Sequence, residues 1–442
     1  YAIYLVDTLG GRELIYRDPE QSCFAPIPLV PRAVPPTLPS ALAENCEDET
    51  GVFYVRDVYQ STQEIPPGSI KRLRVLRMYP QPTIRVPDRS ATLFETPKQV
   101  LGTVPVDESG SVAFRAPASQ PLMFQLLDEN GMAVMSMRTF VYLHPGETST
   151  CVGCHEPRNS TPVRSPLLPS LTVHDITPSD GPQYEGGISF VRTVQPVLDR
   201  HCIGCHGLDE VAGGVNLLGT MDDGPLKLGN VRASVAYHSL TRKPGLVSIA
   251  YRNKETAFSV PKDYYAHAGT LAKLLLEGDA HHVPLGGPKG VDRTGFQRIV
   301  DWLDVNAEFY GDYSWNKQEW MGAEPKAERA LRDHIAETFG PELAAQPYAA
   351  LVNACLPTES RILEAPLPVA SAGWGQIDGG WSSTGDPAYQ HMLKLVLASI
   401  GRPKSQDGSG NCNLTPCECG GCWVHDARSD YRKTLESAAN AP

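Results

Sequence analysis

The chain has 442 residues, a formal net charge of -11 and 41% hydrophobic residues. This length exceeds one ordinary hydrophobic core, so we expect three or four domains. An acidic balance without a basic cluster argues against nucleic-acid binding and favours a basic or neutral protein partner. No apolar run approaches the roughly 18 residues of a membrane-spanning helix, so no transmembrane segment is predicted.

Residues 1–17 read as strand, turn and strand around Gly10-Gly11, which predicts a β-hairpin. A lone hairpin is at best marginally stable. Six prolines follow between Pro26 and Pro39, and they favour an extended linker. We assign residues 1–45 to this hairpin and linker. Because the chain opens at Tyr1 inside a strand pattern, we expect a processed or truncated product.

Residues 46–182 carry recurring strand patterns, which predict a β-rich domain. The patterns occupy residues 52–55, 73–79, 112–114, 122–126 and 132–143. A turn sequence, Asp128-Glu-Asn-Gly131, separates the last two. The total of 39 Gly and 39 Pro fits a loop-rich β protein. We predict a small antiparallel β-sandwich.

Two CxxCH motifs carry the chemistry: Cys151-Val-Gly-Cys154-His155 and Cys202-Ile-Gly-Cys205-His206. In such a motif the two thiols bond to the haem vinyl groups and the adjacent His binds the iron. The alternatives are a disulfide or half of a zinc site, but no paired CxxC at zinc-finger spacing is present. We therefore predict two covalently bound c-type haems. Gly before each second Cys is expected to avoid crowding the macrocycle.

The second motif lies among predicted helices. Apolar residues at helical spacing run from Phe190 to Leu198, despite Pro196, and lead directly into Cys202. Two further helical patterns cover residues 270–276 and 296–303. This order is that of a small cytochrome c domain, which we assign to residues 183–315.

Residues 316–442 contain no CxxCH motif. Residues 325–400 read as mainly helical, and the tail beyond Arg402 is rich in Gly and Cys. We predict a haem-free, cytochrome-like region followed by this tail. The fold class is therefore α+β multidomain: an antiparallel β-sandwich-like domain, a mainly helical cytochrome c domain and the haem-free C-terminal region.

The sixth iron ligand decides between electron transfer and ligand chemistry. For the second haem the candidates are His267, His281, His282 and Met221. The pair His281 and His282 follows a predicted helix ending at Gly278, a natural place to fold over the haem. For the first haem the nearby candidates are His144, His174, Met135 and Met137, although we expect the methionines to pack in the sandwich.

Seven cysteines remain, an odd number, so at least one of them is free or a ligand. They are Cys23, Cys46, Cys355, Cys412, Cys417, Cys419 and Cys422. The last four and His425 could hold zinc. Haem attachment, however, occurs in compartments where thiols are oxidised, which favours disulfides. We therefore expect a periplasmic or otherwise extracytoplasmic protein.

The sequence resembles the hydrazine synthase alpha subunit-like family of dihaem c-type cytochromes over about residues 1–400. The shared stretches are Ala2-Ile-Tyr-Leu-Val-Asp7, residues 12–19, Cys23-Phe-Ala-Pro-Ile-Pro-Leu29, residues 104–110, residues 130–134, Tyr142-Leu-His-Pro-Gly-Glu147, residues 151–157 and Ile299-Val-Asp-Trp-Leu303.

The resemblance implies an N-terminal β-propeller, a β-rich middle domain with one haem and a C-terminal domain with another. Residues 1–17 then correspond to the last strands of a propeller that this sequence lacks. In that family the His of the first motif turns to zinc, and a Tyr four residues later binds iron. Here that position is Asn159, and an amide is a poor iron ligand, so we expect His155 to bind iron. The resemblance thus supports architecture more than activity.

Three hypotheses follow. The leading one is a dihaem electron-transfer protein, a subunit of a larger complex with redox partner proteins. The second is a haem-dependent oxidoreductase that converts a small nitrogen compound at an open first haem. The third is a structural docking subunit that uses the sandwich and residues 325–400 as contact surfaces.

Overall fold

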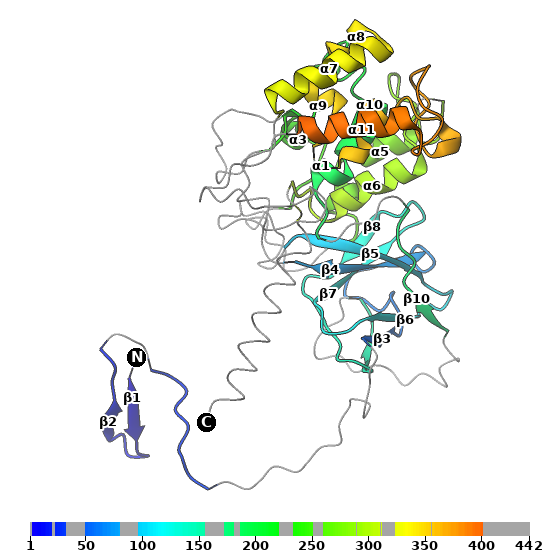
Figure 1. The fold of residues 1–442 in the computed structure, drawn as a ribbon. Coiled ribbons are helices and arrows are strands. Elements are labelled where there is room, and N and C mark those ends of the chain that lie inside the picture. The colour runs from blue at the N-terminus through cyan, green and yellow to red at the C-terminus, as the bar shows by residue number, and fades with distance from the viewer. Residues whose placement is uncertain are drawn as a thin grey trace. The chain divides into compact units, whose positions relative to one another are not determined.

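The computed structural model describes residues 2–19, 23–31, 49–79, 96–154, 172–180, 186–220, 233–250, 260–288, 290–309, 311, 323–354 and 356–400 (Figure 1). The chain divides into two compact units, Tyr1–Ala41 and Leu42–Pro442. None of the helices in the described ranges is long and apolar enough to cross a membrane.

The first unit contains the predicted hairpin, which is confirmed. Strand β1 (Ile3–Val6) pairs antiparallel with β2 (Arg12–Tyr16). Asp7 closes the turn, because its Oδ1 accepts the amides of Leu9 and Gly11, both at 2.8 Å. The apolar side chains of both strands are largely exposed, with Leu5 at 62%. The hairpin therefore has no hydrophobic core of its own.

The second unit begins with two four-stranded sheets packed face to face, here called the sandwich. One sheet has the order β10-β6-β3-β9 and the other β5-β4-β7-β8. Between them Phe53, Phe114 and Phe124 pack with ring centroids 5.0 to 5.7 Å apart. The strand bounds are β3 Thr50–Val55, β4 Arg72–Met78, β5 Lys98–Pro105, β6 Val112–Pro117, β7 Leu122–Leu127, β8 Ala133–Ser136, β9 Thr148–Cys151 and β10 Val173–Asp175.

The prediction of a purely antiparallel sandwich is wrong in one sheet. Strand β9 runs parallel to β3, and β10 runs parallel to β6. Both reach their partners through long connections rather than hairpins, as parallel pairing requires. Strands β5, β9 and β10 were not predicted, and the pattern at residues 132–143 forms only the short β8. Gly102 in β5 is required, because a Cβ there would lie 2.2 Å from the Thr177 carbonyl oxygen.

Residues 186–311 form a group of short helices, here called the motif module. Pro196 breaks the predicted first helix at Val194, because proline lacks an amide hydrogen and clashes with the preceding turn. The other two predicted helices are confirmed as α5 and α6. The helix bounds are α1 Phe190–Thr193, α2 Gln195–His201, η1 Ala212–Gly214, α3 Val235–Arg242, α4 Tyr265–Ala268, α5 Thr270–Glu277 and α6 Arg293–Asp304.

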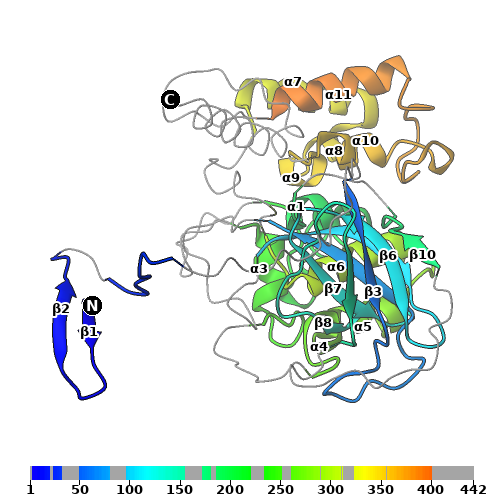
Figure 2. The ribbon, with the colours of Figure 1, turned by 90° about the horizontal axis from the view of Figure 1, so that it is seen from below.

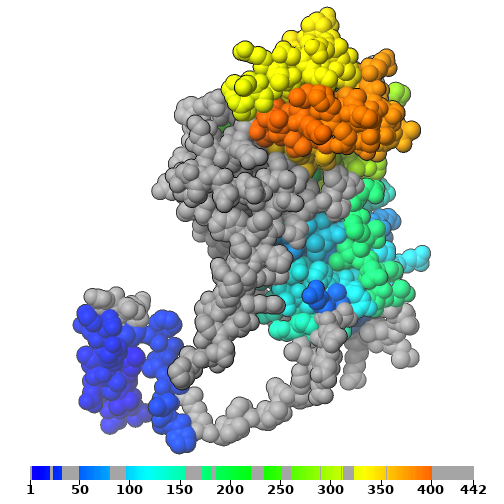
Figure 3. Space-filling view, in the orientation of Figure 1, coloured from blue at the N-terminus to red at the C-terminus, as the bar shows by residue number. Residues whose placement is uncertain are grey.

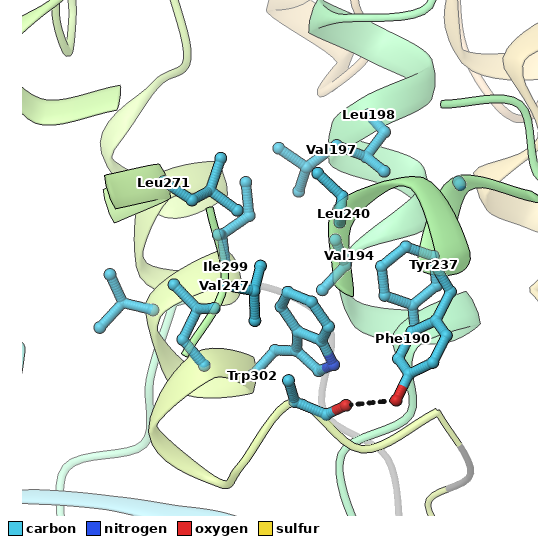
Figure 4. Close-up of a cluster of buried hydrophobic side chains, with 14 of the residues drawn as sticks. Phe190, Val194, Val197, Leu198, Tyr237, Leu240, Val247, Leu271, Ile299 and Trp302 are labelled. Atoms are coloured by element: carbon cyan, nitrogen blue, oxygen red, sulfur yellow. Dashed lines mark hydrogen bonds between the residues drawn. The ribbon is translucent and has the colours of Figure 1, made fainter. Parts of the chain in front are cut away.

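The core of the motif module centres on the indole of Trp302, which is fully buried (Figure 4). Phe190 from α1 lies edge-on to Trp302 at 5.2 Å between centroids, so the helix before the second motif packs against α6. The Tyr237 hydroxyl donates to the Ala307 carbonyl oxygen at 2.9 Å. These contacts fix the start of the chain segment that ends in Cys202.

Residues 323–400 form the C-terminal helical module, which confirms the predicted helical content there. It packs on the motif module (Figure 2), and Figure 3 shows its surface in yellow and orange. Asn353 donates to the Val191 carbonyl oxygen and Gln376 donates to that of Arg200. Its helices are α7 Pro325–Phe339, α8 Pro341–Ala344, α9 Tyr348–Leu351, η3 Pro357–Glu359, α10 Arg361–Glu364, η4 Val369–Ser371 and α11 Pro387–Ser399.

A buried polar cluster joins the sandwich to the motif module. Arg74 of β4 is fully buried and lies 2.6 Å from Asp301 and 2.8 Å from Asp304, both on α6. Gln125 of β7 donates to the Asp304 carbonyl oxygen, and Asp304 accepts the Ala133 amide. Because each buried charge is paired, these contacts hold α6 against the sheet β5-β4-β7-β8.

Candidate functional site

The second CxxCH motif begins where α2 ends. The Cys202 amide donates to the Leu198 carbonyl oxygen at 2.8 Å, and the His206 amide donates to the Cys202 carbonyl oxygen at 3.0 Å. These two bonds fold the motif into one tight turn. Neither Cys202 nor Cys205 is in a disulfide, and Cys205 is exposed. Partial burial raises the pKa of the Cys202 thiol to about 12, with Asp199 and Cys205 raising it further.

The ring of His206 is oriented by the chain that follows it. Its Nδ1 lies 3.1 Å from the Val215 carbonyl oxygen. An N–H at Nδ1 satisfies that carbonyl and leaves Nε2 as the lone-pair nitrogen, which is the arrangement found at metal-bound histidines. The Leu217 amide donates to the His206 carbonyl oxygen at 2.7 Å and fixes the backbone on the same side.

His282 is held by a short turn after α5. That helix ends at Gly278, whose φ of 72° suits only glycine without strain. Asp279 Oδ1 then accepts the amides of His281 and His282, both at 2.7 Å, and lies 2.9 Å from His282 Nδ1. Those two amide bonds, together with the His282 ring, lower the pKa of Asp279 to about 2. The carboxylate therefore fixes the His282 ring through Nδ1 and leaves Nε2 available.

The structure brings His206 and His282 together. Their ring centroids lie 5.9 Å apart and their planes differ by 8°. Within the described ranges neither Nε2 has a hydrogen-bond partner. A metal ion bonded to one nitrogen of each imidazole, at about 2 Å from each, separates the ring centroids by about 6 Å. The observed separation of the two ring centroids is close to this value.

The other candidates for the sixth ligand lie elsewhere. His281 is exposed, and only its amide contacts Asp279. His267 is on α4. Its Nε2 lies 3.2 Å from Asp128 Oδ2 of the sandwich, which is an ion-pair distance, but the two atoms are not aligned for a hydrogen bond. Met221 lies outside the described residues. Among the described residues, no group of three or more His, Cys, Asp or Glu side chains is arranged around a metal position.

The first CxxCH motif starts at the end of β9. Cys151 pairs with Val55 of β3, and the Cys154 amide donates to the Gln60 carbonyl oxygen at 3.1 Å. Both cysteines are partly buried against the core of the sandwich. A Cβ on Gly153 would lie 2.0 Å from the Gln60 carbonyl oxygen. Gly153 is therefore required by close backbone packing, a reason different from the predicted crowding of a haem.

The predicted ligands of the first haem are only partly described. His155 and Asn159 lie outside the described residues. Met135 is buried in the sandwich and the Met137 sulfur accepts the Phe124 amide, so both methionines pack as expected. His174 is on β10, at the opposite edge of its sheet from β9. His144 precedes β9, at the end of that strand away from Cys151.

Sequence reasoning missed Asp279 and the Val215 carbonyl oxygen. An Asp shortly before a His pair is a signal for a side-chain turn, and it could have indicated Asp279. The role of Val215 depends on a backbone atom and has no sequence signal. The tail cysteines 412–422, His425 and Cys355 lie outside the described residues, so the predicted disulfides and the alternative zinc site there stay predictions.

Comparison with known families gives one match. Residues 68–156 match the model of the hydrazine synthase alpha subunit middle domain. This match confirms the resemblance to the hydrazine synthase alpha subunit-like family over that segment. The segment contains β4 to β9 and the first CxxCH motif, and it ends before the motif module.

No curated protein matches the chain. Among solved structures, a chain of Kuenenia stuttgartiensis hydrazine synthase is similar, with 19% sequence identity and a TM-score of 0.41. The similar region covers 61% of this chain and 45% of that chain, so this sequence spans less than half of its length.

Proposed function

We propose that this chain is a dihaem c-type cytochrome subunit that transfers electrons, with its second haem bound through Cys202 and Cys205 and ligated by His206 and His282. The observation that carries this proposal is the 5.9 Å separation of the two nearly parallel imidazoles. That geometry fits a six-coordinate metal with histidine on both faces. Such a centre has no open position for a substrate, so it suits electron transfer.

The protein supplies orientation and electronic tuning at this centre. The Val215 carbonyl oxygen and the Asp279 carboxylate each contact a Nδ1 atom, so the Nε2 atom of each ring would be the one to bind iron. A bound haem supplies reversible one-electron chemistry there. Two imidazole ligands give it a lower reduction potential than a His and Met pair would.

For the first haem we propose attachment through Cys151 and Cys154 with His155 as the iron ligand. Haem attachment at two CxxCH motifs also supports a periplasmic or other extracytoplasmic location. The match of residues 68–156 to a subunit of hydrazine synthase supports a role inside a larger complex. We propose other subunits and redox proteins as partners.

The test compares two neighbouring histidines in the holoprotein. His282→Ala should convert the second haem from low-spin to high-spin, measured by electron paramagnetic resonance of the oxidised protein, because one axial ligand is lost. His281→Ala is the matched control and should leave the low-spin signal unchanged. Intact mass should show two haems in both variants. A low-spin second haem in His282→Ala, or a mass shift of one haem, would overturn the proposal.

A second candidate function is catalysis at the first haem. It is favoured by the match of the segment that contains Cys151 and Cys154 to the hydrazine synthase alpha subunit middle domain. Catalysis requires an open iron position, whereas a relay does not. A high-spin signal in the wild-type protein, together with hydrazine formation by the assembled complex, would favour this candidate. A wholly low-spin spectrum would exclude it.

A further inference from the structure

A buried carboxyl group lies beside the second motif, where its charge raises the pKa of the Cys202 thiol. Asp199 stands on α2, three residues before Cys202, and its side chain is 4% exposed. Its Oδ1 accepts a hydrogen bond from Gln195 Nε2 at 2.8 Å. Among the described residues no cation lies within ion-pair distance of Asp199. A buried carboxylate without a paired cation is unfavourable, so this group favours the neutral acid.

The partner of Asp199 is connected to the backbone of His206. Gln195 is buried, and its Nε2 also donates to the Leu217 carbonyl oxygen at 3.0 Å. The amide of the same Leu217 donates to the His206 carbonyl oxygen. Gln195 Oε1 is buried without a hydrogen-bond partner. Protonation gives Asp199 an O–H donor, and the neighbouring Gln195 side chain has an acceptor without a partner.

The titratable groups that interact with Asp199 lie on α10 and in the motif. On α10, Arg361 favours the ionised form from beyond ion-pair distance, while its Nη1 donates to Gln346 Oε1 at 2.6 Å. In the motif, Asp199 acts on the Cys202 thiol, which becomes an uncharged thioether when a haem is attached, and Asp209 in the following loop acts on Arg361. Burial raises the pKa of Asp199 to about 7, against the opposing effects of the Gln195 hydrogen bond and Arg361.

A second carboxyl group nearby is the competing candidate. Burial and the charge of Glu359 raise the pKa of Glu364, on α10, to about 7, and Arg200 opposes this rise. Glu364 is only half-buried, and none of the hydrogen bonds described here connects its side chain to the motif. It therefore serves as the matched control for Asp199.

We propose that Asp199 takes up a proton from solvent when the second haem accepts an electron and releases it on reoxidation. The inference rests on the proposed function, because it needs a haem at this site. The electron comes from a one-electron donor protein, and the proton adds to a carboxylate oxygen of Asp199. The added electron removes one positive charge near Asp199, which favours the neutral acid. The centre then transfers an electron and a proton together.

The experiment is a potentiometric titration of the full-length holoprotein, followed at the low-spin haem absorption between pH 5.5 and 8.5. The wild-type potential should fall with rising pH near neutrality, and its slope should be the same fraction of about 59 mV per pH unit as the fraction of a proton taken up per electron. The isosteric Asp199→Asn should flatten this slope and keep the low-spin spectrum. Glu364→Gln should keep both the slope and the spectrum.

A direct measurement needs no variant. Reduction of the wild-type protein in weakly buffered solution near pH 7 should take up a fraction of a proton per electron, seen with a pH indicator. The proposal would be overturned by any of three results. These are no proton uptake in the wild type, an unchanged slope of potential against pH in Asp199→Asn, or a slope that is lost only in Glu364→Gln. A wild-type protein without a low-spin second haem would instead overturn the proposed function.

Discussion

At the scale of single residues, the position of the proposed sixth ligand, His282, depends on one side chain that is not itself a proposed ligand. Asp279 accepts the backbone amides of His281 and His282 and contacts the His282 ring at Nδ1. His281 shares the same turn but is exposed, and no contact orients its ring toward His206. Of these two adjacent histidines, only His282 has a ring contact with His206 among the described residues, so we propose it as the ligand.

Asp279→Asn should loosen His282 without removing it. Cyanide competes with His282 for the ferric iron, so its apparent affinity should rise roughly 10- to 100-fold, the usual effect of losing an outer partner of a metal ligand. Optical titration with cyanide measures this change. Asp263→Asn, at an exposed position, is the control and should bind cyanide as the wild type does. Equal affinities in the two variants would contradict the role of Asp279.

The pH dependence of the contact between Asp279 and His282 follows from the lowered pKa of Asp279. The pKa of Asp279 is lowered from its ordinary 3.8 to about 2. The contribution of the ionised Asp279 to the stability of this turn is therefore fully present above about pH 4 and is lost as the pH falls through about 2. At neutral pH the Asp279 carboxylate is therefore ionised and keeps its contacts with His282.

At the scale of elements, α6 is the part that joins the sandwich to the motif module. Its apolar face carries Trp302 into the core of the module, while Asp301 and Asp304 on the same helix bind Arg74 of β4. Burial raises the pKa of Asp304, and the guanidinium of Arg74 opposes that rise. The helix is thus fixed on both sides, by apolar packing and by a paired buried charge.

Arg74→Met should lower the free energy of unfolding by roughly 3–5 kcal/mol, because it leaves two carboxylates buried without their cation. Urea denaturation measures the change. Arg72→Met on the same strand is the control: it removes a partly buried hydrogen bond to Thr103 and should cost only about 1 kcal/mol. Adding Asp301→Asn and Asp304→Asn to Arg74→Met should recover part of the loss. Similar losses for Arg74→Met and Arg72→Met would contradict this account.

At the scale of the whole molecule, the net charge of -11 would affect which partners reach the proposed haem centres. A negative protein attracts cations over a Debye length of about 8–10 Å at physiological salt. The first unit adds a second property: its hairpin exposes apolar side chains on two strands that share no core. Charge would act on the encounter with the proposed redox partners, and a lone hairpin of this kind is at best marginally stable.

Reduction of the oxidised holoprotein by a cationic one-electron donor should slow by roughly tenfold when salt is raised from low to physiological ionic strength. An anionic donor of similar potential should react faster under the same change, because salt screens repulsion in that case. Stopped-flow absorbance of the haem bands measures both rates. Rates that do not depend on salt with either donor would show that net charge does not steer the encounter.

Much of the local structure follows from sequence alone. The strand patterns near residues 52, 73, 112 and 122 and the helices at 270 and 296 were predicted, since alternation and helical spacing are local properties of the chain. The two CxxCH motifs are also local, because attachment needs three side chains within five residues. Even the break at Pro196 could have been predicted from the missing amide hydrogen alone.

Only the tertiary structure decided which residues meet across long sequence separations. His206 and His282 are brought together by packing of the motif module, and sequence left His267, His281 and Met221 as alternatives because each is chemically competent. Arg74 and Asp304 pair across 230 positions, and nothing local marks either as buried. The close approach of Gly153 to the Gln60 carbonyl oxygen is a further contact that the motif itself does not reveal. Such contacts depend on loop closure and core packing, which no short pattern encodes.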